Sequence, residues 1–236
     1  MSNLAAITKK QLPQLCLPRE HGIVVILLIA SLYSLVLQIK SVLFCTALLT
    51  LWLLVLSLQH PRQLMAIASI SALSHACFNP LMALWITIVG TGLILISKTK
   101  IKQTWWHEFI GLGGATIAPL LTAFMVSNQL RLPLTIGTAL LAGVYTSAAI
   151  IHGATLASGK GRHEKAQTLL SLTLALPFWL GFTRLDPLAC SLSLVPYVGL
   201  ILWLAKAKAT GFKTLGRFSA GCLSWVAITL LLTLRI

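Results

Sequence analysis

Nine apolar segments, each close to the length of a membrane-crossing helix, cover most of this chain of 236 residues. We place these segments at approximately 22–39, 41–59, 63–78, 80–97, 109–128, 132–152, 167–184, 187–205 and 218–234. An α-helix needs about 20 apolar residues to cross a hydrocarbon core about 30 Å thick. Inside lipid, backbone polar groups must also be hydrogen-bonded within the chain. The sequence therefore predicts an all-α fold, a polytopic transmembrane helical bundle of about nine helices.

The composition agrees with this class. Hydrophobic residues make up 57% of the chain and charged residues 9%, and the mean hydropathy is +0.91. A soluble domain carries roughly a quarter charged residues. The net charge of +14 does not indicate nucleic-acid binding, because the cations lie in short gaps between apolar segments. In that position they orient the helices and contact anionic lipid headgroups.

The cations concentrate in alternate gaps. Fourteen of the 18 Lys and Arg residues lie before the first segment or after the second, fourth, sixth and eighth: Lys9, Lys10, Arg19, Arg62, Lys98, Lys100, Lys102, Lys160, Arg162, Lys165, Lys206, Lys208, Lys213 and Arg217. Cytoplasmic loops of membrane proteins retain excess cations. Residues 1–20 are therefore predicted to be a cytoplasmic N-terminal segment, and the C-terminus to lie outside. We expect residues 21–236 to form a single transmembrane helical domain.

Residues 63–78 form the weakest segment. They are short and include Ser69, Ser71, Ser74 and His75, so an amphipathic helix on the membrane surface is an alternative. Without this crossing, the cluster of Lys98, Lys100 and Lys102 would lie outside. The charge rule therefore favours nine crossings.

Acidic and histidine side chains gather on the predicted cytoplasmic side. Three of the four acids lie there, Glu20, Glu108 and Glu164, whereas Asp186 lies outside. Five of the six histidines accompany them: His21, His60, His107, His152 and His163. With most of the cations, these groups can bind an anion, exchange protons, or do both. Solvated loop charges are the alternative interpretation.

Two stretches near the N-terminus are candidates for this site. In Pro18-Arg19-Glu20-His21-Gly22, the proline and the acid suit the start of a helix without any function. The functional alternative is that Arg19, Glu20 and His21 project into the bundle, where ionisable groups must pair or line a polar cavity. The second stretch is Gln59-His60-Pro61-Arg62-Gln63. It is either a simple turn, where Pro61 interrupts the helix, or part of the same site.

The segment from His152 to Lys165 is a candidate phosphate-binding stretch. It contains three glycines together with Lys160, Arg162, His163 and Glu164, although its spacing is not that of a Walker loop. Exposed amides and guanidinium groups suit phosphate oxygens. An orientation loop in solvent is the alternative.

The fifth and sixth segments add polar groups nearer the membrane. Glu108 follows His107 and is either a helix-capping residue or a base and ion-pair partner for the basic side. Tyr145 and His152 are seven residues apart, so they share a helical face and could extend the site into the membrane. The small residues from Gly111 to Ala115 predict close helix packing. No metal site, disulfide framework or cofactor is indicated.

The Pro18-Arg19-Glu20-His21-Gly22 string at the start of a first membrane helix resembles the signature of the YwiC-like family of bacterial membrane proteins. The stretch from Glu108 to Gly114 and the segment from Lys213 to Gly216 are similar to that family as well. Arg217 and Phe218 follow where the family pattern has an acidic residue nearby. The resemblance implies a multi-pass protein of the bacterial inner (cytoplasmic) membrane and no established activity.

The architecture also resembles the UbiA-type intramembrane prenyltransferases, which bind isoprenyl diphosphate through magnesium held by two Asp-rich turns. Here the corresponding turns carry His60 and Arg62, and Lys160, Arg162 and Glu164. Magnesium needs hard oxygen ligands, so metal-dependent transfer is not expected. Instead, Arg62, Lys160 and Arg162 would neutralise an anionic headgroup directly, with an isoprenoid or acyl tail among the helices.

Three functions remain open on this sequence. The first is a lipid-binding protein that holds an anionic lipid, quinone or isoprenoid headgroup at its cytoplasmic side. The second is a small-molecule transporter or an assembly factor for a membrane complex. The third is a metal-free prenyl- or lipid-group transferase with Glu20 or Glu108 as base and His21 or His152 as proton carrier. Substrate-binding contacts would come from Arg19, His60, Arg62, Tyr145, Lys160, Arg162, His163 and Glu164.

Overall fold

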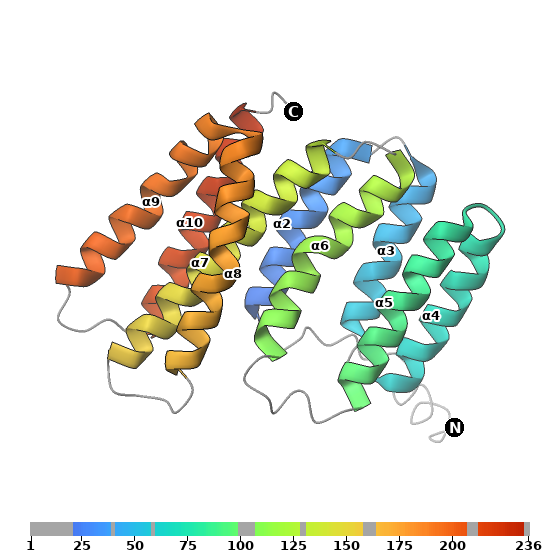
Figure 1. Cartoon of the computed structure of the whole chain (residues 1–236). Coiled ribbons are helices and arrows are strands. Elements are labelled where there is room, and N and C mark those ends of the chain that lie inside the picture. Colours follow the sequence, from blue (N-terminus) through green and yellow to red (C-terminus); the bar gives the residue numbers. More distant parts are fainter. Residues whose placement is uncertain are drawn as a thin grey trace, which may run out of the picture.

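The computed structural model describes residues 21–38, 41–57, 60–98, 107–127, 131–157, 164–206 and 212–233. These residues form nine α-helices and no strand: α2 (His21–Gln38), α3 (Val42–Leu56), α4 (Pro61–Ala76), α5 (Pro80–Lys98), α6 (His107–Ser127), α7 (Arg131–Ala157), α8 (Glu164–Leu185), α9 (Pro187–Lys206) and α10 (Phe212–Thr233). Each predicted segment corresponds to one helix, so the all-α fold is confirmed for the described part of the chain. Helices that follow one another in the chain run in opposite directions, and the nine described helices are arranged roughly in a row from α9 to α4 (Figure 1).

Two tight turns on one side of the bundle are fixed by capping side chains. The Asn79 carboxamide accepts a hydrogen bond from the amide of Met82 at 3.1 Å, and the Asp186 carboxylate accepts one from the amide of Ala189 at 2.9 Å. The helices that follow, α5 and α9, both begin with a proline, whose missing N–H costs nothing in a first turn. Asp186, the one acid on its side, therefore has a structural role as a helix N-cap.

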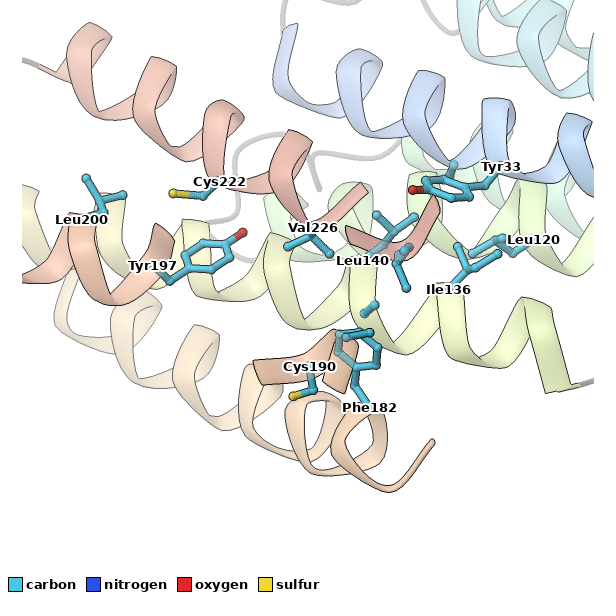
Figure 2. Packing of buried hydrophobic residues seen from close by; sticks show 14 residues of the cluster. Tyr33, Leu120, Ile136, Leu140, Phe182, Cys190, Tyr197, Leu200, Cys222 and Val226 are labelled. Carbon is cyan, nitrogen blue, oxygen red and sulfur yellow. The ribbon is translucent and has the colours of Figure 1, made fainter. Parts of the chain in front are cut away.

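The largest buried cluster joins six helices, α2 and α6 to α10 (Figure 2). Two tyrosine hydroxyls in this cluster form hydrogen bonds to backbone carbonyls of other helices. The Tyr33 hydroxyl donates to the carbonyl of Ala227, and the Tyr197 hydroxyl donates to the carbonyl of Gly143 at 2.9 Å. Such bonds satisfy phenol groups that burial would otherwise leave without a partner.

Large apolar side chains cover the outer surface. Each described helix exposes at least one of them, including Leu28, Leu49, Leu73, Leu84 and Leu176. Soluble proteins rarely expose apolar patches larger than a few hundred Å². Four of the described helices, α7 to α10, are long and apolar enough to cross a membrane by length and composition. The structure therefore fits a membrane protein.

The weak segment at 63–78 corresponds to α4, which ends two residues earlier, at Ala76, and packs along α5 and α3. The α4 and α5 backbones come close where a Cβ built on Gly90 would lie 2.7 Å from the Cβ of Ala68. Figure 1 shows α4 and α5 side by side along their length. This packing makes α4 a member of the helical bundle.

Candidate ligand site at the basic end

One end of the bundle gathers the helix ends that adjoin the cation-rich gaps. At this end, which we call the basic end, α2, α4, α6, α8 and α10 begin and α3, α5, α7 and α9 end. Figure 1 shows all of these helix ends on one side of the bundle, at the bottom of the view. The predicted alternation of the gaps therefore agrees with the up-and-down order of the helices.

Tyr145 and His152 are the predicted site residues whose side chains the structure describes most fully. Both lie on α7, and each is 7% exposed. Because they are seven residues apart, they lie about two turns from one another on one helical face. His152 is the nearer of the two to the basic end, where α7 ends at Ala157.

Tyr145 packs where α7 meets α2, α6 and α8. Its ring stacks on Phe178 of α8 with centroids 5.9 Å apart. It shares a buried cluster with Leu27 of α2 and Leu112 of α6. A Cβ built on Gly113 of α6 would lie 2.7 Å from the Tyr145 hydroxyl oxygen, so any larger residue there would have to displace that hydroxyl. The predicted close approach of the small-residue stretch is confirmed at Gly113.

Neighbouring Gly114 has a different environment. A Cβ built on it would meet nothing within 4 Å, and the residue is exposed. The small-residue stretch therefore packs closely through one of these two adjacent glycines, and the other faces away from the helix contact.

Glu108 lies in the first turn of α6. Glu108 is the second residue of α6, and it stands one turn before Leu112 and two turns before Ala115. Both of those residues belong to the buried cluster that contains Tyr145. The backbone of Glu108 therefore lies at the basic end, at the start of the helix that packs against α2 and α7.

The other predicted residues of this region lie at helix starts or outside the described residues. His21 is the first residue of α2, and Glu164 is the first residue of α8. The side chains of His21, Glu108 and Glu164 lie outside the described part of the structure. Arg19, Glu20, Lys160, Arg162 and His163 lie outside it entirely.

His60 and Arg62 are separated from this group. His60 occupies the N-cap position of α4, and Arg62 is exposed one residue into the helix. Helix α4 packs on α3 and α5, whereas α8 packs on α7 and α9, and Figure 1 shows α2 and α6 between them. Helix α7, which carries Tyr145 and His152, packs on α8, α6 and α2 and ends where those helices begin, whereas α4 lies apart from it.

Two buried polar atoms mark the start of α4. The Nε2 atom of His60 and the hydroxyl of Ser57 are enclosed and have no hydrogen-bond partner among the described residues. The His60 amide donates to the Ser57 carbonyl at 2.8 Å, which fixes the tight turn.

Sequence reasoning did not identify the polar contact around His75, which is buried between α3 and α4. Its Nδ1 atom lies 2.8 Å from the carbonyl of Ser71, and its Nε2 atom lies 3.3 Å from the Thr46 hydroxyl. In the neutral ring, Nδ1–H donates to the carbonyl and Nε2 accepts from the hydroxyl. The four-residue spacing of Ser71 and His75 was a usable signal for the first contact, but no sequence signal indicated Thr46.

The chain matches no protein-family model, no curated protein and no solved structure. Among the side chains that the structure describes, no three His, Cys, Asp or Glu residues are grouped so as to hold a metal ion. The chemistry available at the described part of this site is that of the His152 and Tyr145 side chains. A buried imidazole and a phenol can donate and accept hydrogen bonds, and an imidazole can also exchange a proton near neutral pH.

Proposed function

We propose that this chain is a multi-pass protein of a bacterial inner membrane that binds the headgroup of an anionic lipid, a quinone or an isoprenoid at its basic end. The N-terminal segment lies in the cytoplasm and the C-terminus outside, so the basic end faces the cytoplasm. The observation that carries the proposal is the burial of His152 and Tyr145 on one face of α7, a helix that ends at the basic end, where α2, α6 and α8 begin.

The placement of His152 supports a ligand site. A buried ionisable group in a membrane bundle is costly, so such residues face a polar interior and mark binding sites or proton paths. His152 lies on the last turns of α7, close to the headgroup region that a basic end would meet. A headgroup there would exchange hydrogen bonds with the imidazole, and its tail would run along the apolar helix faces.

The charge at this end supports an anionic ligand. Fourteen of the 18 Lys and Arg residues adjoin this end in the sequence, whereas only three acidic residues do. The basic end therefore has a large excess of positive charge. Helix starts carry partial positive charge from unpaired backbone amides, and α2, α6 and α8 all start here. Phosphate or another anionic headgroup would gain from both sources.

Because α4 lies apart from α7 and α8, fewer of the predicted residues can contact one headgroup. The cations of the α7–α8 connection, Lys160 and Arg162, adjoin the His152 region in sequence, whereas Arg62 belongs to α4. We therefore assign headgroup contact to the α2, α6, α7 and α8 side. We assign Arg62 no headgroup contact. Its role is to keep the turn before α4 on the cytoplasmic side of the membrane.

The test is analysis of lipids that remain bound after purification in mild detergent. The parent is compared with His152→Ala and with His75→Ala, which removes a second buried histidine far from the basic end. The parent and His75→Ala should retain a stoichiometric isoprenoid, quinone or anionic lipid, whereas His152→Ala should lose it by about tenfold or more, as expected for one hydrogen bond to a charged group. Equal retention in both variants, or bulk phospholipid alone in the parent, would refute the proposal.

A further inference from the structure

A second apolar feature lies on the outer surface between α9 and α10, away from Tyr145 and His152. It is a groove of about 420 Å³. Its walls are formed by Pro196, Gly199, Leu200 and Trp203 of α9 and by Phe218, Gly221 and Cys222 of α10. Two of the lining residues, one on each helix, are glycines that leave open space in the groove. A Cβ built on Gly199 or on Gly221 would meet nothing within 4 Å.

Contacts at both ends of the groove hold the two helices together. Toward the basic end, the rings of Trp203 and Phe218 pack with centroids 4.9 Å apart. Toward the other end, Pro196 has no N–H, so the carbonyl of Leu192 loses its helical donor. The indole N–H of Trp225 on α10 donates to that carbonyl at 3.0 Å instead. The groove is therefore a fixed part of the α9–α10 pair, about 10 Å long from Pro196 to Trp203 at the rise of an α-helix.

The apolar lining of the groove and the cations beside it indicate the kind of ligand that the groove can bind. The lining is apolar, and a groove of this kind within hydrocarbon stays dry. At its basic end, exposed Arg217 adjoins Phe218, Lys206 ends α9 and Lys213 is the second residue of α10. No Asp or Glu occurs between residue 187 and residue 236.

We propose that the α9–α10 groove binds one anionic phospholipid, with an acyl chain between Gly199 and Gly221 and the phosphate beside Arg217. Trp203 lies at the headgroup level, where indole rings are favoured. Arg217 then selects an anionic headgroup over a zwitterionic one. This site requires only that the helices lie in a membrane, and it is independent of the ligand proposed for the His152 region.

The test uses native mass spectrometry of the full chain with phosphatidylglycerol and phosphatidylcholine of identical acyl chains. Gly221→Leu and Gly199→Leu each fill the groove, and Gly114→Leu is the matched control, an exposed glycine on α6 with the same open surroundings. The parent and Gly114→Leu should retain one phosphatidylglycerol in preference to phosphatidylcholine. Both groove variants should lose that lipid.

Arg217→Gln should lower the preference for phosphatidylglycerol by about fivefold while an acyl chain still binds, since one cation near the surface contributes that much. Retention in Gly221→Leu and Gly199→Leu equal to that in Gly114→Leu would overturn the proposal, as would equal binding of the two lipids by the parent. His152→Ala should leave phosphatidylglycerol bound here, so failure of this site and failure of the His152 site give different results.

Discussion

Gly113 and Gly114 are adjacent residues of α6 that should respond in opposite ways to the same substitution. In Gly113→Ala, the new Cβ would lie 2.7 Å from the Tyr145 hydroxyl oxygen and 3.9 Å from the ring carbon that bears it. The Tyr145 ring cannot move away freely, because it stacks on Phe178 and belongs to a buried cluster. Overpacking of this kind costs about 1–3 kcal/mol.

Gly114→Ala adds the same methyl group where nothing lies within 4 Å. Alanine also favours the helix over glycine by about 1 kcal/mol, a gain that is common to both variants. The difference in free energy of unfolding between the two variants therefore isolates the clash, and we expect Gly113→Ala to be less stable by about 1–3 kcal/mol.

The double variant Gly113→Ala with Tyr145→Phe tests the cause. Without the hydroxyl, the nearest atom is the ring carbon at 3.9 Å, an ordinary van der Waals distance. The cost of Gly113→Ala should therefore vanish in the Tyr145→Phe background. Reversible unfolding in mixed detergent micelles, followed by circular dichroism, measures the parent, the two alanine variants, Tyr145→Phe and the double variant. Equal stability of the two alanine variants, or an undiminished cost in the double variant, would refute the reasoning.

Three further substitutions test the packing elsewhere. Tyr197→Phe removes the hydrogen bond to the Gly143 carbonyl and should lower the free energy of unfolding by about 0.5–1.5 kcal/mol in the same assay. Asp186→Ala removes the N-cap of α9 and should cost about 1 kcal/mol, whereas Asp186→Asn should be nearly neutral; a cost shared by both variants would contradict the capping role. Gly90→Leu should prevent close packing of α4 on α5 through Ala68 and lower the yield of monodisperse protein, and normal yield would contradict that contact.

The sequence predicted the helices well, because hydropathy reports directly on which stretches are apolar. It was less accurate where a helix continues beyond its apolar part. Helix α7 extends to Ala157, five residues beyond the predicted segment, and α10 begins at Phe212, six residues before its predicted start. In both places the extra turns contain polar or small residues such as Gly153 and Lys213, which a helix tolerates outside hydrocarbon.

The candidate site was predictable only along single helices. The seven-residue spacing of Tyr145 and His152 correctly indicated a shared face, and both side chains are buried. The contact of Tyr145 with Gly113 joins residues 32 positions apart, and no local pattern reports such a pair. The separation of Arg62 from the α7–α8 side depends on the order of helices in the row, which alternating charges do not specify.

The measurement that tests the account most directly is thiol labelling from each side of the membrane. Single cysteines replace Gln103, in a cation-rich gap, and Asn128, in a cation-poor gap, within a chain that lacks the native cysteines. In intact cells, an impermeant maleimide should modify the cysteine at 128 only, and the cysteine at 103 should react once the cytoplasmic face is opened. Labelling of position 103 from outside would place the basic end on the wrong side of the membrane and contradict a cytoplasmic headgroup site.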